Sequence, residues 1–178
     1  ANVCAAETLE KAKRPLIYRV HDTPPNERVR ALSDFLRSMN IKLSLGQTLL
    51  PQLFNGLMEQ AADQPIAPTV SEAVLRTQAQ AIYDVENIGH FGLNLGRYAH
   101  FTSPIRRYAD LLVHRGLIKI MTGKKGSRSS ASREKLDEIC AAISQTEQTA
   151  AKAERRTTAR LAAQILNHKT IKKFEVII

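Results

Sequence analysis

The sequence predicts a predominantly helical α+β protein, and three observations lead to that prediction. Its 178 residues are 43% hydrophobic but only 5% aromatic, with no Trp, so the core must be largely aliphatic. Several segments carry apolar residues at helical spacing, the longest of them from 132 to 168. Strand-like alternation is confined to short stretches, which favours a few short strands beside the helices.

The first third of the chain alternates between helix and strand. Residues 2–13 form an expected helix, and residues 14–21 form an expected strand rich in β-branched and aromatic side chains. Asp22 or Thr23 would then cap a helix that the following pair of prolines opens. The residues expected on the buried face of this helix recur at helical spacing: Val29, Leu32, Phe35, Leu36 and Met39.

The middle of the chain is expected to hold two shorter helices, near 47–61 and 69–80, separated by a Pro-containing linker at 63–68. Two short strands are expected at 81–86 and 92–101. The glycines of this stretch fit neither a P-loop nor a dinucleotide-binding pattern and are interpreted as turn and bulge residues: Gly89, Gly92 and Gly96.

Residues 104–121 are expected to form a helix with a cationic start. Thr102 or Ser103 would serve as its N-cap, and a proline suits its first position. Arg106 and Arg107 would then lie in the first turn, where the helix dipole attracts anions. The segment therefore indicates a phosphate-binding helix start.

Asp110 leaves two interpretations of this helix open. It could orient one arginine and leave the other for a phosphate, or the helix could be an ordinary amphipathic one whose arginines pair with Asp110. One face would hold the apolar residues Ile105, Tyr108, Ala109 and Leu112. Another would hold Ser103, Arg106, Asp110 and His114.

A Gly/Lys/Ser loop with Lys124, Lys125 and Arg128 leads to Ser132, the expected N-cap of a helix that ends near His168. At ~1.5 Å per residue, this helix would be about 50 Å long. Its apolar stripe would comprise Leu136, Ile139, Ile143, Ala150, Ala153, Leu161 and Ile165. On the same helix Glu154 either pairs with its basic neighbours or stays available; those neighbours are Lys152, Arg155 and Arg156.

The positive charge is concentrated in the second half of the chain. Residues 1–96 carry 9 Lys/Arg against 10 Asp/Glu, whereas residues 97–178 carry 17 against 7. This asymmetry indicates a polyanionic partner that binds the second half. A basic surface that is merely solvated remains the alternative.

Several classes of protein are excluded by composition and spacing. Cys4 and Cys140 lie far apart without metal-ligand spacing, which is typical of buried thiols in a reducing compartment. The five histidines lack zinc spacing and the acidic residues are scattered, so no metal site is expected in this chain. With no apolar run of about 20 residues and no signal peptide, we expect a soluble, cytoplasmic protein.

The sequence patterns at both ends of the chain are those of truncated elements. A helix pattern begins at Ala1 without a start or cap, and residues 173–178 alternate like a strand that has no partner. We therefore expect a fragment of a longer protein.

The motifs between His90 and Arg115 resemble the signature of a known family. They read His90-Phe-Gly-Leu93, then Tyr98-Ala-His-Phe-Thr-Ser-Pro-Ile-Arg-Arg-Tyr108, then Asp110 and His114-Arg115. The pattern is similar to the RNB catalytic domain of the RNase II/RNase R exoribonucleases, and its Arg-Arg-Tyr form is nearer RNase R. Further segments that resemble the family are Ala1-Asn2, Ala5-Ala-Glu7, Val20-His21, Ala153-Glu-Arg155 and Phe174-Glu-Val176.

The resemblance implies an α+β, mostly helical C-terminal part of an RNB catalytic domain over 1–170, followed at 171–178 by the start of an OB-type RNA-binding barrel. It implies processive hydrolysis of RNA, from single-stranded 3′ ends to 5′-mononucleotides, with Mg²⁺ in the full-length enzyme. The metal-binding aspartates would lie upstream of Ala1, so the chain alone would be inactive. Without the missing N-terminal part, the fragment should expose apolar surface and a sheet edge, so we expect it to associate with that part or with itself.

The resemblance also implies roles for individual residues. Arg106 matches the catalytic arginine that stabilises charge on the scissile phosphate, and Glu154 matches an acid that positions the RNA 3′ end. The residues implied as RNA-binding or supporting are Arg97, His100, Thr102, Ser103, Arg107, Tyr108, His114, Arg115 and Arg155.

Two other functions are compatible with the residues. The first is a non-catalytic, basic helical RNA-binding module, whose binding would depend strongly on salt. The second is a DNA-binding helix-turn-helix that uses residues 104–121 for recognition. The second is disfavoured because that helix lacks short Asn and Gln side chains for reading bases.

Overall fold

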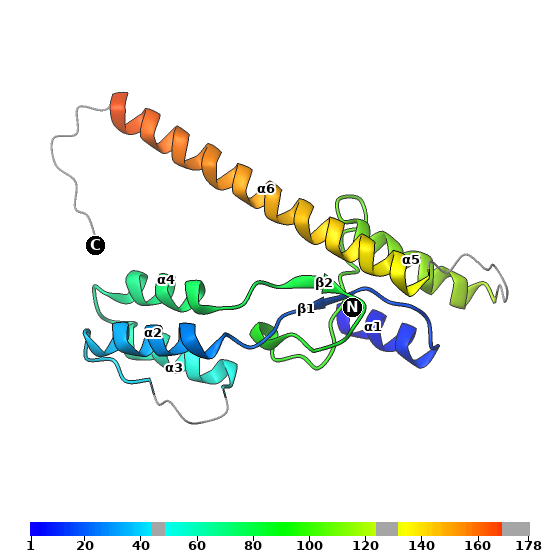
Figure 1. Ribbon diagram of the computed structural model, residues 1–178, viewed down its shortest axis with the longest axis horizontal. Helices are drawn as coiled ribbons and strands as arrows, with labels where there is room; N and C mark the ends of the chain where they lie inside the picture. The colour runs from blue at the N-terminus through cyan, green and yellow to red at the C-terminus, as the bar shows by residue number, and fades with distance from the viewer. Residues whose placement is uncertain (44–48, 124–131, 169–178) are drawn as a thin grey trace.

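The computed structural model describes residues 1–43, 49–123 and 132–168 and confirms a predominantly helical α+β fold (Figure 1). The described elements follow in chain order as α1 (Asn2–Lys11), β1 (Tyr18–Val20), α2 (Asn26–Arg37), α3 (Pro51–Ala61), α4 (Ala67–Thr77), β2 (Ile82–Asp84), the 3₁₀ helix η1 (Phe91–Leu93), α5 (Tyr108–Met121) and α6 (Arg133–His168). In these ranges no helix combines the length and apolar character that a membrane span requires.

The two strands form a short antiparallel ribbon near the centre of the molecule (Figure 1). Tyr18 pairs with Asp84, so β1 and β2 join segments that are more than sixty residues apart in sequence. The strand predicted at 92–101 is wrong, because this stretch begins in η1 and then runs as irregular backbone. Its polar backbone groups bind side chains and single backbone partners, such as the Arg19 N–H of β1 that donates to the Tyr98 carbonyl, and they form no continuous ladder with a neighbouring strand.

Helices α2, α3 and α4 pack together as a helical unit beside the ribbon (Figure 1). Its fully buried centre consists of Leu36, Leu57, Ala61 and Val70. The predicted cap of α2 is wrong, since the helix begins at Asn26 and Asp22 Oδ1 instead accepts the adjacent Thr23 N–H. Phe35 was expected in the buried face but is 38% exposed, and Ser33 takes an inward position.

Helices α1 and α5 pack against each other on the other side of the ribbon. Leu9 and Val113 are buried in a shared apolar cluster, and Gly116 permits the close contact. A Cβ atom at Gly116 would lie only 2.8 Å from Leu9 Cδ2. The start predicted for α5 at Pro104 is wrong by four residues, because the helix begins at Tyr108.

Helix α6 crosses the ribbon and continues away from the rest of the molecule (Figure 1). The predicted cap is confirmed, since Lys135 N–H donates to Ser132 Oγ at 3.4 Å. Leu136 and Cys140 are buried against the ribbon and α5. The predicted apolar stripe runs too far, because its distal members Leu161 and Ile165 are 49% and 55% exposed.

Two predictions lie outside the described residues. They are the basic loop residues Lys124, Lys125 and Arg128, and the barrel strand expected within 171–178. The structure tests neither of them.

Candidate functional site

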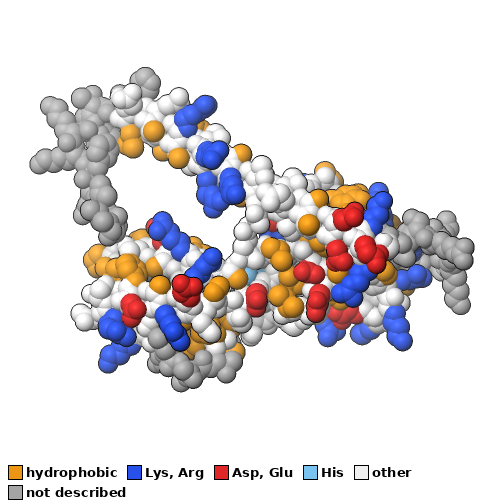
Figure 2. Space-filling model, in the orientation of Figure 1, with side chains coloured by type: hydrophobic (Ala, Val, Ile, Leu, Met, Phe, Trp, Pro, Cys, Tyr) orange, Lys and Arg blue, Asp and Glu red, His pale blue; other side chains and the backbone are white. Residues whose placement is uncertain are grey.

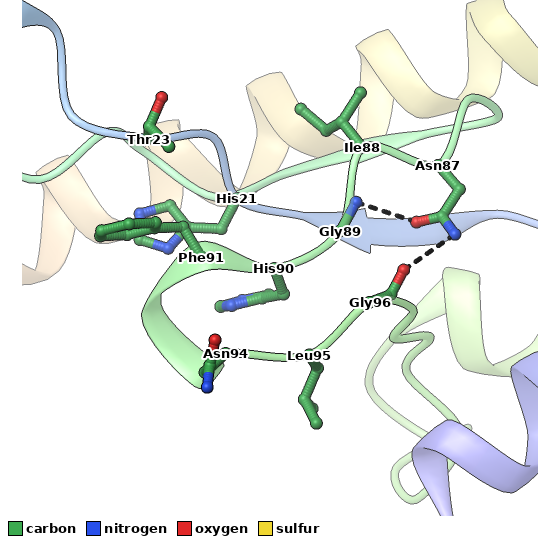
Figure 3. Close-up of a pocket in the computed structure, with 10 residues that line it drawn as sticks. All are labelled: His21, Thr23, Asn87, Ile88, Gly89, His90, Phe91, Asn94, Leu95 and Gly96. Carbon is green, nitrogen blue, oxygen red and sulfur yellow. Dashed lines mark hydrogen bonds between the residues drawn. The ribbon is translucent and has the colours of Figure 1, made fainter. Parts of the chain in front are cut away.

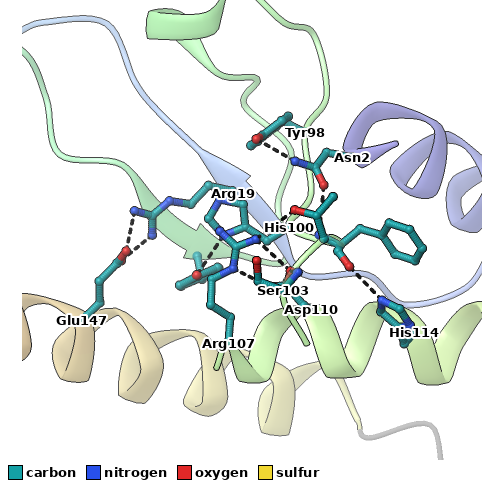
Figure 4. Close-up of polar contacts among 12 residues, drawn as sticks. Asn2, Arg19, Tyr98, His100, Ser103, Arg107, Asp110, His114 and Glu147 are labelled. Atoms are coloured by element: carbon teal, nitrogen blue, oxygen red, sulfur yellow. Dashed lines mark hydrogen bonds and ion pairs between the residues drawn. The ribbon is translucent and has the colours of Figure 1, made fainter. Parts of the chain in front are cut away.

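The segment from Tyr98 to Arg107 is irregular but is held at several points along its length. The Asn2 side chain donates to the Tyr98 hydroxyl at 2.8 Å and accepts the Phe101 N–H at 3.1 Å. The Phe101 carbonyl is 2.8 Å from His114 Nε2, and the two rings stack with centroids 4.3 Å apart. Side chains from α1 and α5 therefore set the path of this backbone (Figure 4).

Asp110 holds the end of the same segment. It is 0% exposed, and its Oδ1 accepts the Ser103 N–H at 2.8 Å and an Arg107 Nη2–H at 2.9 Å. Arg107 Nε lies 2.9 Å from Asp110 Oδ2 as a second ion-pair contact. Because Asp110 binds both Ser103 and Arg107, the backbone of Arg107 stays extended, and α5 starts only after this residue.

Arg106 is left exposed between these two anchored residues. Within the described residues its guanidinium makes no ion pair or hydrogen bond. Asp110 thus pairs with Arg107 alone, which agrees with the prediction that it could orient one arginine and leave the other available. The neighbouring Ile105 and Tyr108, expected on the buried face, are 102% and 45% exposed.

A second set of polar contacts reaches the segment from α6. Both Glu147 carboxylate oxygens accept hydrogen bonds from Arg19, at 2.5 and 2.9 Å. The Arg19 guanidinium carbon lies 4.7 Å from the centre of the Tyr83 ring, and the Tyr83 hydroxyl is 2.9 Å from His100 Nδ1. Figure 4 shows this cluster beside the Asp110 contacts.

The ionisable side chains at the centre of this cluster are held neutral. Burial, reinforced by the positive charges of Arg107 and Arg19, lowers the pKa of His100 to about 4. Burial also raises the pKa of Tyr83 above its ordinary value. At neutral pH the pair therefore acts through hydrogen bonding rather than charge.

The other predicted site residues divide into paired and unpaired groups. Arg97 forms an ion pair with Glu10 at 2.9 Å, and the Thr102 hydroxyl lies 3.5 Å from Arg107 Nη2. The residues that are exposed and lack an ion pair within the described ranges are Arg115, Glu154 and Arg155. The alternative pairing of Glu154 with its basic neighbours is therefore not formed.

Sequence reasoning missed Glu147, together with the contacts of Arg19 and Tyr83. Leu136, Cys140 and Glu147 recur at helical spacing on the face of α6 that meets the ribbon. This periodicity is the signal that could have indicated an acidic residue directed inward. Glu154 lies about two helical turns further along, on the exposed part of α6.

A shallow cavity of about 410 Å³ lies beside η1 (Figure 3). His21 forms part of its wall, with Nδ1 accepting the Gly92 N–H at 2.8 Å and Nε2 2.7 Å from the Ala79 carbonyl. Burial, reinforced by His21, lowers the pKa of His90 to about 4. No Lys, Arg, Asp or Glu is among the residues that line the cavity, so it offers no charged group to a phosphate.

Charged side chains are arranged unevenly along α6. Figure 2 shows Lys and Arg side chains along its far half and Asp and Glu side chains gathered near its start. Across the described ranges, no three His, Cys, Asp or Glu side chains come together in a group that could hold a metal ion. The described residues therefore offer no set of ligands that fits a magnesium ion.

Comparison with known proteins identifies the family. The family model for the RNB domain matches residues 1–123. Ribonuclease R of Vibrio cholerae is 45% identical over 129 residues, which are 72% of this chain and 16% of that protein. The chain thus spans about one sixth of the length of this relative.

Solved structures agree with this assignment. Mycoplasma genitalium RNase R in complex with double-stranded RNA matches with a TM-score of 0.86 and 29% identity, over 97% of this chain and 31% of that one. The same protein in complex with ribose-methylated single-stranded RNA gives 0.84 and 28%, over 93% and 26%. On the match to the family model and the identity to its relatives, the chain belongs to the RNB domain family.

Proposed function

We propose that this chain is part of a 3′-to-5′ exoribonuclease that hydrolyses RNA processively to 5′-mononucleotides. The observation that carries the proposal is Arg106, which is exposed and has no ion-pair partner among the described residues, between two residues anchored by the buried Asp110. The names of the similar proteins, ribonuclease R and RNase R bound to RNA, support RNA as the substrate.

Arg106 would stabilise negative charge on the scissile phosphate. A guanidinium offers several N–H donors in a fixed plane, which suits the oxygens of a phosphate. Because its turn is held by Asn2, His114 and Asp110, little reorganisation is needed when charge develops in the transition state. Arg107 would support the turn through its ion pair with Asp110.

The remaining assignments are part of the same proposal. Glu154 would help to position the RNA 3′ end, and its carboxylate, which is exposed and has no ion pair within the described part of the chain, is compatible with hydrogen bonds from ribose hydroxyls. Arg115 and Arg155 would contact backbone phosphates, whereas His100 and His114 would support the segment that carries Arg106. We also propose Mg²⁺ as the cofactor of the full-length protein, with no ligand assigned among the described residues.

The test is the variant Arg106→Ala in the full-length protein. We expect kcat for a labelled single-stranded RNA to fall by about 10²–10³, as when one transition-state donor is removed. RNA affinity should change by less than a few-fold, because the interaction belongs to the transition state. Arg37→Ala, on an exposed arginine of α2, is the matched control. Hydrolysis at the normal rate by the Arg106 variant would refute the assignment.

The distribution of charge favours a second candidate, a non-catalytic RNA-binding module. Four exposed cations on the far half of α6 would bind phosphates: Lys152, Arg155, Arg156 and Arg160. For single-stranded RNA, replacing all four by Gln should reduce the slope of log K against log salt by about 3. The control replaces four exposed cations elsewhere, namely Lys11, Lys13, Arg30 and Arg37. Salt-sensitive binding by a full-length protein that does not hydrolyse RNA would favour this candidate.

A further inference from the structure

Four side chains form a continuous line of contacts from α6 to the segment that carries Arg106. Glu147 on α6 binds Arg19 on β1 through both carboxylate oxygens. The Arg19 guanidinium lies over the Tyr83 ring on β2, at 4.7 Å from its centre. The Tyr83 hydroxyl then reaches His100 Nδ1 at 2.9 Å. Each contact joins a different pair of segments.

The middle of this line of contacts is buried. The Arg19 side chain is 13% exposed and Tyr83 is 7% exposed, so the cation–π contact and the Tyr83 hydrogen bond operate at reduced dielectric. The Glu147 side chain is 42% exposed, so water partly screens its ion pair with Arg19. The buried part of the network allows few alternative arrangements, because breaking a contact of Arg19 or Tyr83 leaves a buried polar group without a partner.

The docking of α6 does not by itself require this arrangement. Leu136 and Cys140 already bury the start of α6 against the ribbon, and Ser144 Oγ accepts the Tyr83 N–H at 3.0 Å. The Tyr83 hydroxyl adds nothing to that docking, since its hydrogen bond goes to His100 instead of α6. His100 lies only three residues before Ser103, where the turn that carries Arg106 begins.

We propose that Glu147 is a positioning residue that acts on the Arg106 turn through Arg19, Tyr83 and His100. Both oxygens of its carboxylate are occupied by Arg19, so it supports the site without binding the substrate. This inference rests on the proposed exoribonuclease activity for its kinetic readout. It states in addition that the conformation of the Arg106 turn depends on a side chain of α6.

The kinetic test compares Glu147→Gln and Tyr83→Phe in the full-length protein. Each should lower kcat for RNA hydrolysis about tenfold with KM within about twofold, as expected when one buried hydrogen bond that aligns a transition-state group is lost. Glu72→Gln, which breaks the exposed Arg76–Glu72 pair on α4, is the matched control and should leave both constants unchanged. A normal kcat for Tyr83→Phe beside a reduced one for Glu147→Gln would mean that the pair only docks α6, and would overturn the proposal.

A second measurement is independent of activity. Hydrogen exchange of the Phe101 and Ser103 amides in the full-length protein should become about tenfold faster in both variants but not in Glu72→Gln. Unchanged exchange in the two variants would also overturn the proposal. If the unsubstituted protein fails to hydrolyse RNA, the proposed function fails, and the exchange rates alone decide whether Glu147 positions the turn.

Discussion

Asp110 and Arg107 form an ion pair in which the carboxylate is fully buried. The Asp110 carboxylate is 0% exposed, and the Arg107 side chain is 21% exposed. Because the same carboxylate also accepts the Ser103 N–H, it holds the residues on both sides of Arg106. Asp110 therefore both stabilises the turn and leaves Arg106 exposed on it.

Asp110→Ala should lower the free energy of unfolding by about 3–5 kcal/mol, because it leaves the Arg107 charge and the Ser103 N–H without their buried partner. Urea unfolding measures this change. The comparison is Asp34→Ala, which removes an exposed pair with Arg37 and should cost less than about 1 kcal/mol. Equal losses for the two variants would contradict the role given to Asp110.

Gly116→Ala and Gly56→Ala should have opposite effects on stability. At Gly116 the added Cβ would lie 2.8 Å from Leu9 Cδ2 between α1 and α5, so we expect a loss of about 1–3 kcal/mol. At Gly56, within α3, nothing lies within 4 Å, so alanine should stabilise the helix by up to about 1 kcal/mol. Thermal unfolding of the two variants checks both signs, and a stabilised Gly116 variant would argue against the close packing of the helices.

The protein should lose stability as the pH falls from about 6.5 to about 4. Burial lowers the pKa of both His90 and His100 to about 4, below the ordinary value of 6.5. Between these values the unfolded chain binds more protons than the folded one, so the free energy of unfolding decreases as protons are added. Denaturant titrations at pH 7 and pH 4.5 measure the loss. In His100→Gln the free energy of unfolding should decrease less between pH 7 and pH 4.5. An equal decrease in this variant would show that His100 does not contribute to the pH dependence.

The two cysteines should differ in their reaction with thiol reagents. Cys4 is exposed, whereas Cys140 is 4% exposed and burial raises the pKa of its thiol to about 12. At neutral pH the Cys4 thiol should react quickly, whereas the Cys140 thiol should react only when the protein unfolds. Mass spectrometry after a brief treatment with maleimide checks this order. Rapid labelling of Cys140 would show that the start of α6 opens from the ribbon.

The helices were predictable from sequence because their signals are local. Spacing of apolar residues located α1, α3, α4 and α6 to within a few residues, and Ser132 was recognisable as a cap. The stretch 92–107 was not predictable in this way. Its conformation depends on Asn2 and on Asp110, and Asn2 is almost a hundred residues away in sequence. The local sequence pattern therefore could not indicate this conformation.

The candidate site was predictable only in part for a related reason. The motif predicts Arg106 as a phosphate-stabilising residue, and the structure shows that its neighbour Arg107 is the arginine that pairs with Asp110. Glu147 was overlooked because an acidic residue on a long helix is ordinarily a surface residue. Its partner Arg19 lies on a strand 128 residues earlier, so only the fold brings the two side chains together.

The exposed far half of α6 has a consequence for how this helix forms. Beyond Ala151 every described side chain of the helix is exposed, so this half gains little from packing within the described residues. An isolated helix of that length is marginal in water because its first turn is costly to nucleate. The packed turns around Leu136 and Cys140 supply that nucleus, from which the helix propagates at little further cost per residue. On heating, α6 should therefore unwind from His168 inward, as a gradual loss of helical signal before the core unfolds.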